Sequence, residues 1–166
     1  MAIDPWRRGF GFAFFEGERS LIDWGLCQVP LNNRNEKCLA RLKAMLDRHH
    51  PDFLVLEPWD APDCRRCKRV RKFLAAAAKL ALSMGVEIRF ISHRDVVISF
   101  SQSEVEPSKP VVARMLALLY PELAFRLPPH RMPWMGEDPR MSLYDACALA
   151  VAYYRSYGNA EVPKSK

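Results

Sequence analysis

The chain has 166 residues, 49% of them hydrophobic and 27% charged, and 25 Lys and Arg against 19 Asp and Glu give a net charge of +6. This length and apolar content predict a single globular domain, residues 1–157, with a short tail at 158–166, and they exclude disorder as the main state. No apolar stretch approaches the roughly 18–20 residues of a membrane span, and the positive charge favours an anionic partner.

Residues 1–4, 9–16 and 20–29 have the composition of strands, and four phenylalanines lie in the second of them. Glu16-Gly17-Glu18 resembles a tight hairpin turn between the second and third. We therefore expect the chain to begin with an antiparallel meander of three strands.

The rest of the chain alternates helical and strand patterns. The apolar runs 53–56 and 86–91 are predicted strands, and the proline-rich stretch 123–138 is a predicted loop. Spacing and composition predict helices at residues 35–49, 65–84, 109–120 and 141–157. Strands that are joined by helices favour right-handed parallel crossovers. The predicted fold is α/β, with a five-stranded mixed sheet, three antiparallel strands then two parallel, flanked by helices.

The five cysteines are an odd number in a chain whose start lacks the pattern of a secretion signal. We expect reduced thiols and a cytoplasmic protein. Cys64 and Cys67 have the spacing of half a zinc site, but no second half follows at zinc-finger distance. No metal is therefore predicted at these thiols.

Three acids are placed beside apolar segments. Asp4 ends the first strand, Glu57 follows the strand 53–56, and Asp145 begins an Ala- and Leu-rich helical run. One such acid alone is usually a solvated strand end, but several beside a core are costly unless a cation lies between them. Mg²⁺ prefers carboxylate oxygens. The joint pattern therefore predicts a metal site formed by Asp4, Glu57 and Asp145.

The ordered set of motifs resembles the RNase H-like nuclease superfamily and, within it, the RuvC-type Holliday junction resolvases. The motifs that carry the resemblance are, in chain order, Ala2-Ile3-Asp4-Pro5 followed by Gly11, Leu54-Val55-Leu56-Glu57, Ser108-Lys109-Pro110, and the helix that Asp145 begins. They extend over nearly the whole chain. No single motif is specific, so the resemblance depends on their order and spacing.

The resemblance implies a crossover-junction endodeoxyribonuclease of DNA recombination and repair that hydrolyses branched DNA with two Mg²⁺ or Mn²⁺ ions. Asp4 would bridge both ions, Glu57 and Asp145 would each complete one side, and Lys109 would hold the scissile phosphate. The implied products carry a 5′-phosphate and a 3′-hydroxyl. A homodimer is also implied, because a four-way junction presents two symmetric strands.

The sequence departs from the family pattern near the acids. Trp6 stands where the family usually has glycine, and Ser142 stands where a fourth acid usually precedes the last aspartate by one helical turn. Asp138, or its neighbour Glu137, is a candidate replacement, although Asp138 is also explained as a charge near a helix end. The segment 128–134 is either a lid over the substrate or a packed surface loop.

Six of the eight residues from 65 to 72 are basic, namely Arg65, Arg66, Lys68, Arg69, Arg71 and Lys72. No acid interrupts them, so we expect nucleic-acid contacts rather than a merely solvated face. On the predicted helix, Arg65, Arg69 and Lys72 share one face. Trp6 and Trp59 either stack on bases or pack in the core. His93 is either an auxiliary group of the site or a structural residue.

Three other functions share features with this sequence. The YqgF-type nucleases, which process ribosomal RNA precursors, carry a motif that residues 91–95 do not match. Actin-like ATPases and sugar kinases need two such domains, for which this chain has no room. A catalytically silent relative that binds structured nucleic acid stays open, and Trp6 and Ser142 are its support.

Overall fold

The computed structural model describes residues 1–61, 64–101, 105–129, 131–132 and 134–157. The strands are β1 (Ala2–Trp6), β2 (Gly9–Phe15), β3 (Leu21–Gln28), β4 (Phe53–Leu56) and β5 (Glu87–Phe90). The helices are α1 (Arg34–His49), α2 (Lys68–Ser83), α3 (His93–Phe100), α4 (Lys109–Leu119), the 3₁₀ helix η1 (Pro121–Arg126) and α5 (Met141–Tyr157). None of the helices in these ranges is long and apolar enough to cross a bilayer.

The five strands form one mixed sheet in the order β3-β2-β1-β4-β5. β1 pairs antiparallel with β2, and β2 with β3, whereas β4 is parallel to both β1 and β5. The predicted arrangement of three antiparallel strands followed by two parallel ones is therefore confirmed. The expected turn between β2 and β3 is also present, and it contains Gly17 at a φ of 79°, which glycine adopts without a steric penalty.

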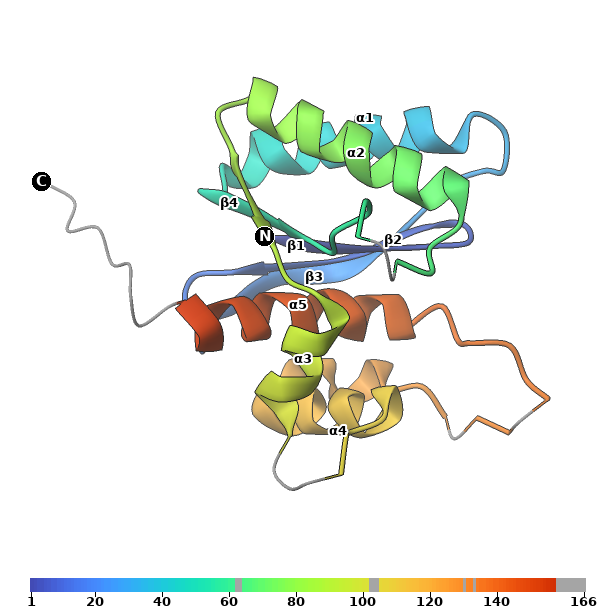
Figure 1. Cartoon of the computed structure of the whole chain (residues 1–166), viewed down its shortest axis with the longest axis vertical. Helices are drawn as coiled ribbons and strands as arrows, with labels where there is room; N and C mark the ends of the chain where they lie inside the picture. Colours follow the sequence, from blue (N-terminus) through green and yellow to red (C-terminus); the bar gives the residue numbers. More distant parts are fainter. Residues whose placement is uncertain (62–63, 102–104, 130, 133, 158–166) are drawn as a thin grey trace, which may run out of the picture.

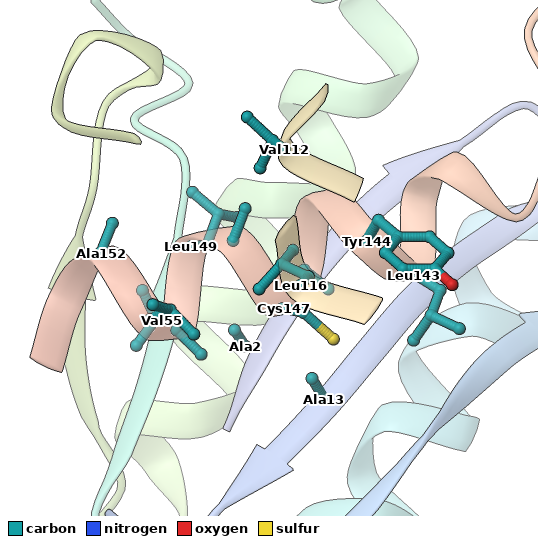
Figure 2. Packing of buried hydrophobic residues seen from close by; sticks show 14 of the residues in the cluster. Ala2, Ala13, Val55, Val112, Leu116, Leu143, Tyr144, Cys147, Leu149 and Ala152 are labelled. Atoms are coloured by element: carbon teal, nitrogen blue, oxygen red, sulfur yellow. The ribbon is translucent and has the colours of Figure 1, made fainter. Parts of the chain in front are cut away.

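Helices cover both faces of the sheet. α1 and α2 lie on one face, and α5 lies on the other, with α3 and α4 beyond it (Figure 1). Strand alternation explains the two cores: Ile3 faces α1 and α2, whereas Ala2, Ala13 and Val55 pack toward α5 (Figure 2). α5 is apolar all round because it lies between the sheet and α4, as expected for an enclosed helix.

The second predicted helix was placed too early. α2 begins at Lys68, after Cys67 as its extended N-cap, so Arg65 and Arg66 precede the helix. The prediction that Arg65, Arg69 and Lys72 share a helix face is therefore wrong. The guanidinium of Arg66 is hydrogen-bonded to Asp4 of β1 and to Glu57 just after β4, which holds this part of the chain against the strand ends.

Two short helices were not predicted. α3 follows β5 and begins with a capping box, in which Ser92 and Asp95 bond reciprocally to each other's backbone N–H. η1 occupies the start of the segment that was predicted as loop. The tail at 158–166, and residues 130 and 133 of the candidate lid or surface loop 128–134, lie outside the described residues.

Candidate active site

Strand register brings two of the three acids together. Ala2 of β1 and Val55 of β4 are register partners, and both pack toward α5. Asp4 lies two residues after Ala2 on β1, and Glu57 lies two residues after Val55, directly beyond the end of β4, so alternation places both on that face at the same level. Both acids line a cavity of about 40 Å³, and Asp145, on α5, lines it as well. The three carboxylates therefore converge, and their role as metal ligands stays a prediction.

α5 presents an acid at only one point of its buried length. Every residue from 141 to 153 is buried except Asp145. A charge within an enclosed helix is costly unless the surroundings compensate it. Asp145 is therefore the one position where this helix opens toward a polar site.

Two side-chain cations compensate the acids. The guanidinium of Arg66 bridges the first two, with Nη2 2.5 Å from Oδ1 of Asp4 and Nε 2.6 Å from Oε2 of Glu57. Lys109, the first residue of α4, places Nζ 2.6 Å from Oδ2 of Asp145. Charge-assisted bonds of this length are among the stronger hydrogen bonds in proteins.

Burial dominates the electrostatics of the site. It raises the pKa of Asp4 to about 7, and the nearby charge of Asp145 adds to the effect, whereas Arg66 and Lys109 oppose it. Burial likewise raises the pKa of Asp145, against the opposing charge of Lys109. The pKa of Arg66 is raised by Asp4 and Glu57 although burial alone would lower it. Arg66 and Lys109 therefore offset only part of the cost of burying these carboxylates.

Incomplete compensation of this kind fits a divalent cation. Three carboxylates supply the hard oxygen donors that Mg²⁺ prefers, and the two nearby cations leave one formal negative charge uncompensated. In the present arrangement one oxygen of each carboxylate is paired with Arg66 or Lys109. Among the described residues, no three metal-ligating side chains surround a single point. The donor set therefore suits a metal, but side-chain cations now hold the donors.

Ser142 ties the helix to the strands beneath it. Its buried hydroxyl accepts a hydrogen bond from the N–H of Gly11 at 2.8 Å and donates one to the carbonyl oxygen of Asp4 at 2.5 Å. Gly11 has no room for a side chain, because an added Cβ would lie 2.2 Å from the carbonyl oxygen of Ser142. The position at which the resemblance implies a fourth acid therefore carries a positioning residue. Its hydroxyl fixes α5, and with it Asp145, next to Asp4.

The two acids of the loop before α5 lie differently. Glu137 reaches the cluster indirectly, with Oε1 3.1 Å from Nζ of Lys109. The carboxylate of Asp138 is bonded to Arg140, and Asp138 lines a separate cavity of about 470 Å³ rather than the small one. No contact of Asp138 with the other acids supports its role as a ligand, which stays a prediction.

The basic segment divides into paired and exposed groups. Arg66 holds the acids, Arg69 donates to the carbonyl of Trp6 at 3.0 Å, and Arg71 donates to the carbonyl of Cys64. The three exposed members are Arg65, Lys68 and Lys72. Only these three present their charge freely to solvent, and their contacts with nucleic acid stay a prediction.

The remaining candidates also have clear places. Trp59 packs edge-on against Phe90, with ring centroids 5.3 Å apart, which supports the core interpretation. Trp6 is half-buried at the end of β1. His93 is exposed at the start of α3 and lines the small cavity, which no periodicity in the sequence indicated. Its place there favours an auxiliary group of the site.

No protein-family model matches this chain, and a search of curated proteins finds no relative in sequence. Among solved structures, the chain is similar to RuvC of T. thermophilus in complex with a Holliday junction substrate, with a TM-score of 0.60 and 15% identity over 94% of this chain and 95% of that one. A Thermus thermophilus RuvC structure gives a TM-score of 0.59 and 16% identity, covering 95% and 96%. These likenesses extend over nearly the whole of each chain and show that this protein has a RuvC-like fold.

Proposed function

We propose that this protein is a divalent-metal-dependent endonuclease that cleaves phosphodiester bonds of branched DNA. The observation that supports it best is the convergence of Asp4, Glu57 and Asp145 on one cavity from β1, the end of β4 and α5. The fold is a second support, because the similar RuvC structure was solved in complex with a Holliday junction substrate. An oxygen donor set of this kind, in a basic protein, suits a metal and a phosphate together.

Asp4, Glu57 and Asp145 would hold two ions of Mg²⁺ or Mn²⁺. When bound, the ions supply an activated water and neutralise the charge that develops on the leaving oxygen. Lys109 would donate hydrogen bonds to the scissile phosphate, since it lies at the edge of the same cavity and is partly exposed. His93 would contact the same phosphate or its neighbour, since it lines the same cavity. The exposed Arg65, Lys68 and Lys72 would hold flanking phosphates in a salt-dependent way.

A second candidate function is metal-independent binding of structured nucleic acid. Two observations favour it: the hydroxyl of Ser142 is engaged with backbone groups, and Arg66 already holds two of the three carboxylates. In this alternative the two ion pairs are permanent and the acids serve only the structure.

Cleavage of a labelled four-way DNA junction and of a matched duplex, in Mg²⁺ or Mn²⁺, tests the proposal. Wild-type protein is expected to nick the junction symmetrically, and Asp4→Asn is expected to abolish nicking while junction binding persists. The symmetric pattern would also support a homodimer. Tight binding that weakens with salt, without any cleavage by the wild type, would favour the second candidate.

A further inference from the structure

Arg66 is the cation that lies between two of the three candidate metal ligands. Its guanidinium lies between the carboxylates of Asp4 and Glu57 and also donates to the carbonyl of Pro5 at 3.3 Å. The cavity that these groups line measures about 40 Å³, room for little more than a water or two. A divalent ion with its waters would therefore compete with this guanidinium, which bonds one oxygen of each carboxylate, for the space between them.

We infer that Arg66 is an exchangeable internal cation. When a divalent ion binds, the guanidinium of Arg66 would move from the carboxylates of Asp4 and Glu57 to a backbone phosphate of the substrate. Metal and DNA would then bind cooperatively, because each removes Arg66 from its present partners. This inference rests on the proposed function only in taking the acids as metal ligands and a phosphodiester as the substrate.

The exchange involves a side chain rather than the backbone that carries it. On the N-terminal side of Arg66, the carbonyl of Cys64 accepts a hydrogen bond from Arg71. On its C-terminal side, Arg69 is anchored by a hydrogen bond to the carbonyl of Trp6 on β1. With both flanks tied down, a displaced guanidinium stays within one side-chain length of the carboxylates. The side chain of Arg66 is 28% exposed, so a path to solvent already exists.

Charge and geometry favour a phosphate as the new partner. The planar fork of arginine matches phosphate oxygens as well as it matches carboxylates. A doubly charged ion beside Asp4 and Glu57 would repel the guanidinium that it replaces. The two bonds that Arg66 makes to the carboxylates are therefore transferable to a phosphate without leaving its own charge unpaired.

The first experiment measures binding of Mn²⁺ alone by electron paramagnetic resonance of the free ion. Arg66→Gln is expected to bind Mn²⁺ about tenfold tighter or more than the wild type, because the charged hydrogen bonds that compete with the ion are gone. The matched control is Arg48→Gln, an exposed arginine in the last turn of α1, and it is expected to leave the affinity unchanged. Equal affinities of wild type and Arg66→Gln would overturn the inference.

Removing Arg66 leaves a buried carboxylate without its partner, so the variant is expected to melt at a lower temperature without metal. Mn²⁺ is then expected to raise the melting temperature of Arg66→Gln more than that of the wild type. Arg66→Lys keeps the charge without the two-pronged fork and should give an intermediate affinity for Mn²⁺. A destabilised Arg66→Gln that does not respond to Mn²⁺ would contradict the competition.

A second measurement separates exchange from a merely structural ion pair. Junction affinity is measured by fluorescence anisotropy at constant ionic strength, with and without Ca²⁺, with a gel to confirm intact DNA. Arg66→Gln is expected to weaken junction binding by a larger factor in Ca²⁺, since only then does the guanidinium reach a phosphate. The same factor in both buffers would refute the transfer to phosphate.

These outcomes are independent of the nuclease assay. Tighter Mn²⁺ binding by Arg66→Gln, together with no cleavage by the wild type, would uphold the exchange and reject the nuclease. Cleavage by the wild type, with no effect of Arg66→Gln on metal affinity, would do the reverse.

Discussion

Replacing Ser142 by alanine tests the idea that this residue positions the site. The change removes one buried hydroxyl that serves the N–H of Gly11 and the carbonyl of Asp4. Ser142 is 4% exposed, so water does not replace the lost partner. A buried donor left unpaired costs about 1–3 kcal/mol.

The expected loss of unfolding free energy is therefore about 1–3 kcal/mol, and at roughly 2–4 °C per kcal/mol the melting temperature should fall measurably. Urea unfolding followed by tryptophan fluorescence gives the free energy directly. Asp145 lies one turn after Ser142 on α5, so metal affinity is expected to fall together with stability.

Ser83→Ala is the matched control. Ser83 is an exposed serine whose hydroxyl donates to a helix carbonyl at 2.7 Å, and its loss should stay within about 0.5 kcal/mol of the wild type. If Ser142→Ala were as stable as Ser83→Ala, the hydroxyl would not bridge helix and sheet. Ser142 would then simply replace the fourth acid of the family pattern, without a positioning role.

Three further outcomes are expected. Gly11→Ala should cost more than about 3 kcal/mol and abolish metal binding, because the new Cβ meets the backbone of Ser142 at 2.2 Å; a urea melt checks this. Without metal, stability should fall as the pH rises from about 3.8 to about 7, because burial raises the pKa of Asp4 and the folded state keeps a proton that the unfolded state has lost. Melts across this range measure the trend, and Asp4→Asn should reduce its slope but leave the contribution of Asp145, whose pKa burial also raises. Asp145→Asn should weaken Mn²⁺ affinity at least about tenfold, whereas Asp138→Asn should leave it unchanged, because the carboxylate of Asp138 is paired with Arg140. A large effect of Asp138→Asn would show that this ion pair breaks when metal binds.

Much of the sheet follows from patterns that can be read in the sequence. The apolar run before Glu57 and the short run before Asp4 predict strands, and the helices between them favour a parallel arrangement. Once the two strands are neighbours, a side-chain period of two is enough to place both acids on one face. The convergence of Asp4 and Glu57 could therefore be predicted from the sequence.

The cations that pair with the acids could not be predicted from the sequence in the same way. Arg66 belongs to a basic run, and nothing in that run distinguishes the residue that turns inward from the three that remain exposed. The outcome depends on where α2 begins and on the path of the chain from β4, and both are set by tertiary contacts. α3 was missed for another reason: eight residues are too few for periodicity, although the capping box of Ser92 and Asp95 is a local signal.

The site divides into a fixed part and an exchangeable part. Asp4 and Asp145 lie on buried strand and helix, and Glu57 follows its strand directly, so the carboxylates are held by the two cores. The cations come from the periphery: Arg66 precedes α2, and Lys109 begins α4. Sites built on rigid elements hold their geometry, whereas long cationic side chains have many rotamers to choose from. A protein that needed only neutral, silent acids would be as well served by apolar residues at these positions, since replacing buried ion pairs by apolar groups is often neutral or stabilising. Fixed acids with partly exposed, long-chain cations are instead the arrangement in which a metal can take the place of Arg66 and Lys109 beside the acids, while these two side chains turn to a phosphate, without moving the fold.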